Sequence, residues 1–254
     1  MKPSRSVADC HLYLCTPDRP DLADFVAACI AGGVDVVQLR EKHLEAKPLL
    51  ERACVVRSVC SDAGVPFILN DRPDLALDAG ADGVHVGQDD APVALARRIL
   101  GPDAIIGLST HGPADLAGAI GSGWGSATSA SGVSGASGAS GASGASGAGG
   151  LSYISAGPVE ATPTKPGRAG TGLAYLTRAT TAVAKRAAAM PVFVTGGVTP
   201  ERIPVLARAG ARHFVVVRYL TEAADPQLAA RALRDAIDSA LGGGVGEDVG
   251  GVSG

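Results

Sequence analysis

The sequence has no uninterrupted apolar run of about 18 residues, the length that a membrane-spanning helix needs. Its first nine residues, Met1 to Asp9, also lack the apolar core of a secretory signal. We therefore expect a cytoplasmic protein that does not bind membranes.

The sequence also lacks a strong charge of either sign, since its formal net charge is −3 over 254 residues. A protein that binds nucleic acid through phosphate contacts carries a marked excess of Lys and Arg, and that excess is missing here. The composition, 46% hydrophobic and 19% charged, is typical of a soluble globular protein. We expect no nucleic-acid partner.

No CxxC pair occurs, although the chain has five cysteines, Cys10, Cys15, Cys29, Cys54 and Cys60. All lie in strand-like or helix-like surroundings in the first quarter of the chain, and their number is odd. Reduced, buried thiols are therefore a better interpretation than disulfides or a zinc site.

What the sequence does contain is a repeated alternation of short apolar runs with Ala- and Leu-rich helical stretches. Eight runs are predicted strands: 12–16, 36–40, 67–71, 83–87, 105–110, 153–158, 191–197 and 213–218. Eight strands, each followed by a helix, close a (β/α)8 barrel. The predicted fold class is therefore α/β, a (β/α)8 TIM barrel.

The stretches between the strands carry apolar residues at spacings of three and four, as crossover helices do. The predicted helices cover 21–31, 46–63, 91–100, 173–189 and 200–209, with shorter segments at 73–79 and 113–120. The length fits one barrel of about 200 to 250 residues with tails. We expect a single domain over residues 1–241.

Two segments depart from this pattern. Residues 121–150 contain a Gly-Ala-Ser repeat, which can bury too little apolar surface to offset the entropy of ordering it. They are predicted to form a flexible insertion, which includes the only tryptophan, Trp124. Residues 242–254 are predicted to be a disordered Gly-rich tail.

Polar residues gather where the predicted strands end. In a parallel barrel the active site lies at this end of the strands. Gln38, Arg40 and Lys42 combine an amide and two cations within five residues, which suits anionic oxygens, although an ordinary charged loop would look the same. Asp71 and Asp90 follow the next two strands. A single Asp there more often caps a helix. Two on adjacent strands favour a metal and diphosphate site, since Mg²⁺ takes one or two protein carboxylates and completes its shell with water and phosphate oxygens.

Other candidates occur along the second half of the barrel. The segment 162–167 offers two hydroxyls and a cation between prolines, and is either a phosphate clamp or a stiff turn. Gly196 and Gly197 after the seventh strand, with Val217 and Arg218 at the end of the eighth, fall where barrels often bind phosphate on backbone N–H groups. His85, within the fourth strand, fits a barrel-interior histidine as well as a substrate contact.

Taken together, these motifs occur in the order found in thiamine phosphate synthases, and the chain resembles that family over residues 11–228, except for the Gly-Ala-Ser segment. The motifs that carry the resemblance are Gln-Leu-Arg-Glu-Lys at 38–42, Asn-Asp at 70–71, Gly-Val-His-Val-Gly-Gln-Asp-Asp at 83–90, Ile-Gly-Leu-Ser-Thr-His at 106–111, Gly-Pro at 157–158, Thr-Pro-Thr-Lys-Pro at 162–166 and Thr-Gly-Gly-Val at 195–198.

The resemblance implies a transferase of thiamine biosynthesis. It would condense 4-amino-2-methyl-5-hydroxymethylpyrimidine diphosphate, here the pyrimidine diphosphate, with hydroxyethylthiazole phosphate, here the thiazole phosphate. The products would be thiamine phosphate and pyrophosphate, formed in a dissociative, Mg²⁺-assisted alkyl transfer. The implied cofactor is Mg²⁺ and the implied partners are these two small molecules, with a homo-oligomer left open.

By similarity, each part of the site has its own residues. The pyrimidine diphosphate would be bound by Gln38, Leu39, Arg40, Glu41, Lys42, Asn70, Ser109 and Lys165. The thiazole phosphate would be bound by Thr162, Thr164, Gly197, Val217 and Arg218. Asp71 and Asp90 would hold the metal. The catalytic residues would be Lys165, Ser109, Arg40 and Lys42, acting by positioning and electrostatics without a protein nucleophile.

Three positions depart from the family pattern. Glu160 and Ala161 stand where an aromatic residue and a proline are common, and Arg218 stands where a serine is usual. A guanidinium could strengthen a phosphate contact. A carboxylate at position 160 would repel phosphorylated substrates unless it points outward.

Two rival functions remain open on the sequence alone. A thiazole tautomerase of the same superfamily would share the thiazole phosphate half but would not need Gln38, Arg40, Lys42, Asp71, Asp90 and Lys165. A non-catalytic regulator that binds a thiamine precursor would normally have lost a metal carboxylate or the Thr-Lys loop. Both features persist here, so the synthase is the favoured hypothesis.

Overall fold

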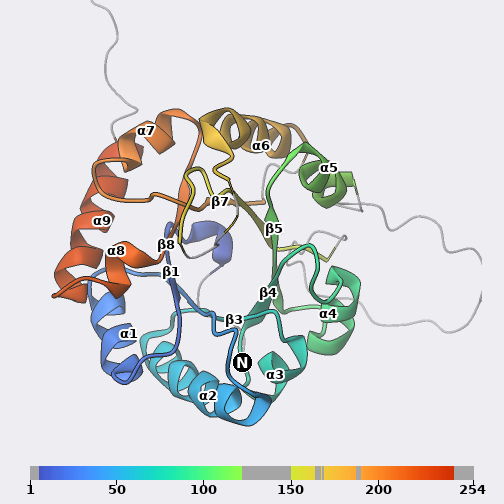
Figure 1. Ribbon diagram of the computed structural model, residues 1–254, viewed down its shortest axis with the longest axis vertical. Coiled ribbons are helices and arrows are strands. Elements are labelled where there is room, and N and C mark those ends of the chain that lie inside the picture. The colour runs from blue at the N-terminus through green and yellow to red at the C-terminus, as the bar shows by residue number, and fades with distance from the viewer. Residues whose placement is uncertain (1–5, 122–149, 164–166, 168, 187–189, 243–254) are drawn as a thin grey trace, which may run out of the picture.

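The computed structural model describes residues 6–121, 150–163, 167, 169–186 and 190–242. Eight parallel strands form a closed barrel in the order β1 to β8, and Figure 1 shows helices surrounding it on all sides. The strands are β1 (Leu12–Thr16), β2 (Val36–Leu39), β3 (Phe67–Asn70), β4 (Gly83–Val86), β5 (Ile105–Thr110), β6 (Tyr153–Ala156), β7 (Val192–Val194) and β8 (His213–Val216). The predicted (β/α)8 barrel is confirmed, and all eight strands lie within the predicted ranges.

The helices of the outer layer follow the strands in turn. They are α1 (Leu22–Ala31), α2 (Ala46–Ala63), α3 (Pro73–Asp78), α4 (Val93–Leu100), α5 (Pro113–Gly121), α6 (Gly172–Arg186), α7 (Ile203–Arg208), α8 (Arg218–Thr221) and α9 (Pro226–Gly242), preceded by the 3-10 helix η1 (Val7–Asp9). The elements η1, α8 and α9 were not predicted from the sequence. The end of α9 includes Gly242, the first residue of the predicted tail, and the remainder of that tail lies outside the described residues. So do residues 122–149 of the predicted insertion and residues 187–189 of the predicted sixth helix.

Alternation along the strands divides the core into two layers. In β1, Leu12 and Leu14 belong to the layer between strands and helices, whereas Tyr13 belongs to the barrel interior. Period-two alternation explains this, because successive side chains of a strand point to opposite faces. Both faces are covered, so every residue of β1 to β4 is buried and the strands are almost continuously apolar.

The interior layer is closed at the N-terminal end of the strands by η1. Its Val7, followed by Cys10, packs with the interior side chains Tyr13, Tyr153 and Phe193. Ser6 caps this short helix by accepting a hydrogen bond from the Ala8 N–H. The N-terminal end of the barrel, called the plugged end below, is therefore filled by these side chains. A substrate cavity can lie only at the opposite, C-terminal end of the strands.

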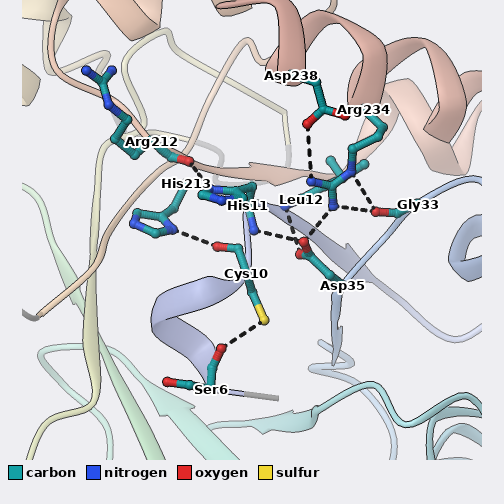
Figure 2. Close-up of polar contacts among 10 residues, drawn as sticks. All are labelled: Ser6, Cys10, His11, Leu12, Gly33, Asp35, Arg212, His213, Arg234 and Asp238. Atoms are coloured by element: carbon teal, nitrogen blue, oxygen red, sulfur yellow. Dashed lines mark hydrogen bonds and ion pairs between the residues drawn. The ribbon is translucent and has the colours of Figure 1, made fainter. Parts of the chain in front are cut away.

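The seam between β1 and β8 is held by reciprocal contacts at this plugged end, drawn in Figure 2. Nδ1 of His11 contacts the Arg212 carbonyl oxygen at 2.8 Å, and Nδ1 of His213 contacts the Cys10 carbonyl oxygen at 2.6 Å. The two imidazole rings stack with centroids 5.3 Å apart. Burial is the main reason that the pKa of His213 is lowered, so this imidazole is held neutral at the seam.

The described helices include none that is both long and apolar enough to cross a membrane.

Candidate active site

A cavity of about 950 Å³ opens at the C-terminal end of the strands and brings most of the predicted site residues together. Those that line it are Gln38, Arg40, Glu41, Lys42, Asn70, Asp71, Asp90, Ser109, Thr162, Gly197, Val217 and Arg218. They come from strands β2 to β8 and the turns after them, so one cavity joins motifs that are up to 180 residues apart in the chain.

Of the three other predicted residues, one is described and does not line the cavity. Thr164 and Lys165 lie outside the described residues. Leu39 is fully buried between the barrel and the helices, because it alternates with Gln38 along β2. Any contact that Leu39 makes with a substrate is therefore a backbone contact.

The metal candidates Asp71 and Asp90 lie next to each other, and Asp71 also pairs with Lys42. Asp71 Oδ2 lies 3.3 Å from Nζ of Lys42, and Asp90 Oδ2 accepts a hydrogen bond from the Gly87 N–H at 2.7 Å. Asp71 has a positive φ of 63°, an uncommon conformation for a residue with a side chain. Its N–H donates to the His85 carbonyl oxygen at 2.8 Å, so pairing with the end of β4 supports this turn. Strained backbone of this kind clusters at functional sites.

The surroundings of Asp71 disfavour its negative charge. Burial raises the pKa of Asp71 to about 6, and hydrogen bonding and charge repulsion from Asp90 add to the effect, while Lys42 opposes it. Two carboxylates that repel each other in this way suit a divalent cation, and two oxygen ligands match what Mg²⁺ takes from proteins. No group of three or more His, Cys, Asp or Glu in the described part of the chain could hold a metal.

The loop after β2 is organised by Glu41. Its carboxylate accepts hydrogen bonds from the backbone N–H groups of Lys42 at 2.7 Å and His43 at 2.8 Å. Its other oxygen accepts one from the Asp18 N–H at 3.4 Å. Glu41 therefore shapes the loop that carries Lys42, which explains an acidic residue between two cations of a predicted anion site.

Ser109, at the end of β5, is held from both its backbone and its side chain. The Gln88 side-chain amide donates to the Ser109 carbonyl oxygen at 2.6 Å, and the hydroxyl of Ser109 lies 2.9 Å from Nε2 of His85. His85 is thus a barrel-interior histidine that also contacts a predicted site residue. The structure therefore bears out the barrel-interior alternative for His85, and a substrate contact by this residue stays a prediction.

The turn after β7 packs closely against Pro158 and Glu160, and it has glycine at two positions. Gly196 and Gly197 have φ values of 87° and 72°. A Cβ atom on Gly196 would lie 2.6 Å from Cβ of Pro158, and one on Gly197 would lie 2.4 Å from Oε2 of Glu160. Only glycine fits both positions, and the Glu160 carboxylate lies directly against the turn.

Glu160 is paired, which bears on the concern raised by the sequence. It forms an ion pair with Arg202, just before α7, instead of projecting alone toward the cavity. The guanidinium neutralises much of its charge next to the glycine turn. Arg218 also lines the cavity, at the start of α8.

Gln88 and His111 are among the polar side chains that line the cavity without a role predicted from the sequence. Nδ1 of His111 lies 2.5 Å from the Gly157 carbonyl oxygen, so this ring supports the turn after β6. Both residues follow strands directly, in the motifs 83–90 and 106–111. Their position just after a predicted strand could have identified them as candidates from the sequence.

Comparison with known proteins agrees with this geometry. A family model described as thiamine monophosphate synthase matches residues 12–126 and 129–220. The chain belongs to the thiamine monophosphate synthase family. Membership makes it an enzyme, a transferase of the thiamine pathway, and supports thiamine-phosphate synthase activity.

Relatives of the family cover nearly the whole chain. The chain is 42% identical over 250 residues to the thiamine-phosphate synthase of Arthrobacter sp. (strain FB24), an alignment that covers 92% of this chain and 96% of the relative. It is 40% identical over 246 residues to that of Mycobacterium sp. (strain KMS), covering 92% and 95%. Among solved structures, thiamine phosphate pyrophosphorylase from Pyrococcus furiosus superposes with a TM-score of 0.71 at 24% identity over 91% of this chain and 96% of that one, which supports the fold.

Proposed function

We propose that the chain joins the pyrimidine diphosphate to the thiazole phosphate, with Mg²⁺ held by Asp71 and Asp90, and releases pyrophosphate. The observation that carries the proposal is the division of the cavity around the barrel. Apart from Lys165, which lies outside the described residues, those assigned to the pyrimidine diphosphate and the metal come from β2 to β5 and the turns after them. The described residues assigned to the thiazole phosphate follow β6, β7 and β8. In a closed barrel of eight strands these two arcs face each other across the cavity, as two substrates that must react require.

The reaction that we propose is a substitution at the methylene carbon of the pyrimidine. The bond from this carbon to the diphosphate oxygen breaks, and its electron pair leaves with pyrophosphate. The electron-rich aminopyrimidine spreads the resulting positive charge, and the lone pair of the thiazole nitrogen forms the new carbon–nitrogen bond. No proton has to be removed by the protein, so no nucleophilic or basic side chain is needed.

The residues of the chain act on the charge of the leaving group. Arg40 and Lys42 provide cations for the diphosphate oxygens, and Ser109 offers a hydroxyl at the end of β5. Lys165 has the same assignment from the family resemblance. When bound, Mg²⁺ would supply further positive charge to the diphosphate. The positive φ values of Gly196 and Gly197 shape the turn whose backbone N–H groups we assign to the thiazole phosphate.

Substitution of the metal carboxylates tests the proposal. We expect Asp71→Asn and Asp90→Asn each to lower turnover about 100-fold or more and to raise the Mg²⁺ concentration needed for half-maximal rate, because each removes a charged ligand at the point where leaving-group charge develops. Asp89→Asn is the matched control, since Asp89 is the exposed neighbour of Asp90. The rate of pyrophosphate release is measured against Mg²⁺ concentration.

Equal behaviour of the three variants would contradict the assignment of the metal to Asp71 and Asp90. Wild-type protein that binds the thiazole phosphate without releasing pyrophosphate would favour the tautomerase or the regulator instead.

A further inference from the structure

A chain of hydrogen bonds runs through the barrel interior and ends at Ser109. The hydroxyl oxygens of Tyr13 and Tyr153 are 2.9 Å apart, and the Tyr153 hydroxyl lies 3.0 Å from Nδ1 of His85. Nε2 of His85 lies 2.9 Å from the hydroxyl of Ser109. The four residues lie on β1, β6, β4 and β5, and all four are buried.

Packing holds the members of this chain in place. The Tyr153 ring occupies space left by Gly107, where a Cβ atom would lie 2.1 Å from Cζ of the tyrosine. Phe193 packs edge-on against both tyrosine rings, with centroids 5.3 Å from Tyr13 and 5.1 Å from Tyr153. The His85 ring stacks on Tyr153 with centroids 5.5 Å apart. This row of hydrogen bonds is therefore held by close packing in the barrel interior. Neither the family assignment nor the sequence motifs account for it.

The donors of the chain can be ordered from its buried end. Among the described residues, Tyr153 is the only hydrogen-bond partner of the Tyr13 hydroxyl. If His85 donated from Nδ1 toward Tyr153, the Tyr153 proton would go to Tyr13, and the Tyr13 proton would be left in the interior without an acceptor. Burying a donor without an acceptor is unfavourable. In the opposite order Tyr13, Tyr153 and His85 each have an acceptor, and the Ser109 hydroxyl is left to donate.

We propose that this row of hydrogen bonds orients His85 so that Nδ1 accepts from Tyr153 and Nε2 donates to Ser109, and that Ser109 directs its own proton into the active-site cavity. Tyr13 donates to Tyr153, and Tyr153 donates to Nδ1 of His85. Burial raises the pKa of both tyrosines well above the usual value, so both phenols stay protonated and can donate at any working pH.

The consequence for the reaction rests on the proposed function. With its lone pairs facing His85 and the more distant Ser155 hydroxyl at 3.5 Å, Ser109 can donate to an anionic oxygen of the diphosphate. In the opposite order Ser109 would donate to His85 and present only lone pairs to the cavity, where they would repel that oxygen. His85, Tyr153 and Tyr13 are positioning residues in this account, because they act through Ser109.

Imidazole ¹⁵N NMR of the wild-type protein without substrates tests the order of donors directly. The His85 signal is assigned by its loss in His85→Gln. We expect an unprotonated Nδ1 and a protonated Nε2 near neutral pH. A protonated Nδ1 with an unprotonated Nε2 would overturn the proposal. The measurement needs no enzyme activity, so it stands even if the wild-type protein releases no pyrophosphate, a result that would count against the proposed function alone.

Steady-state kinetics then test whether the His85 tautomer affects turnover. Tyr153→Phe removes the donor to Nδ1, and we expect a fall in kcat of about tenfold, with little change in the KM of the thiazole phosphate and a mixture of His85 tautomers by NMR. Tyr13→Phe leaves Nδ1 of His85 as the acceptor for the Tyr153 hydroxyl. We therefore expect the His85 tautomer and kcat to change little in this variant. Tyr175→Phe is the control, because Tyr175 lies on α6 outside the barrel.

A conservative variant separates positioning from simple packing. His85→Gln places an amide donor near the position of Nε2 and should retain more of the kcat than His85→Leu, which fills similar space without a donor. Equal kcat for these two variants, or an unchanged His85 tautomer and kcat in Tyr153→Phe, would overturn the proposal. If Tyr153→Phe does not fold, the wild-type NMR and the two His85 variants decide the question.

Discussion

At the scale of single residues, Glu160 has the most specific consequence for substrate binding. Its carboxylate lies against Gly197, at the turn that we assign to the thiazole phosphate, and Arg202 neutralises it. Both side chains are partly exposed, with 47% of Glu160 and 34% of Arg202 accessible. Solvent therefore screens their interaction, and only modest effects are expected from either. A phosphate that binds here would meet a negative charge and a positive charge side by side.

Substituting Glu160 and substituting Arg202 should change the KM of the thiazole phosphate in opposite directions. Glu160→Gln removes the repulsion and should lower the KM of the thiazole phosphate about two- to fivefold, whereas Arg202→Gln leaves the carboxylate uncompensated and should raise it by a similar factor. Both changes should shrink at high salt. Initial rates at varied thiazole phosphate and ionic strength measure this. A higher KM in Glu160→Gln would mean that the carboxylate helps to form the turn instead of opposing the phosphate.

At the scale of elements, Asp35 ties three segments together at the plugged end of the barrel, as Figure 2 shows. Its carboxylate accepts hydrogen bonds from the backbone N–H groups of His11 and Leu12, both at 2.9 Å, at the start of β1. It also accepts one from the guanidinium of Arg234 on α9 at 2.5 Å. Arg234 donates to the Gly33 carbonyl oxygen as well, at 2.6 Å. The last helix is thereby joined to the first two strands.

Removing this carboxylate should destabilise the whole barrel. We expect Asp35→Ala to lower the free energy of unfolding by about 3 kcal/mol, because it leaves the buried N–H groups and a guanidinium without their acceptor. Asp74→Ala, which breaks the exposed pair with Arg72, should cost less than about 0.5 kcal/mol. Urea denaturation of the two variants and the wild type compares them. Similar losses of stability would show that Asp35 does not hold the seam.

At the scale of the whole molecule, burial separates one cysteine from the other four. All five lie within the described residues and none forms a disulfide, as the sequence predicted, but Cys54 on α2 is exposed while the others are buried. Burial raises the pKa of Cys29 and of Cys60 to about 12. A thiol reacts through its thiolate, so these two are protected both by lack of access and by lack of charge.

Thiol counting checks this arrangement. A bulky maleimide should label one thiol per native chain at neutral pH and five after denaturation, and Cys54→Ser should reduce these numbers to none and four. Fast labelling of several thiols in the native protein would contradict the packing of the barrel layers.

The fold could be predicted because each strand is a short apolar run bounded by polar residues. The helix α9 was missed although its buried residues Ala230, Leu233 and Ile237 follow helical spacing. Alternation along β2 could have shown that Leu39 points away from the cavity. The order of donors from Tyr13 to Ser109 could not have been found in this way, since Tyr13 and Tyr153 are 140 residues apart and meet only in the closed barrel.

The measurement that tests the central claim most directly is pyrophosphate release by the purified protein. The protein is given Mg²⁺, the pyrimidine diphosphate and the thiazole phosphate, each component is omitted in turn, and thiamine phosphate is followed by mass. We predict equal amounts of pyrophosphate and thiamine phosphate, formed only when the metal and both substrates are present. Folded protein that forms neither product from the complete mixture would contradict the proposed reaction.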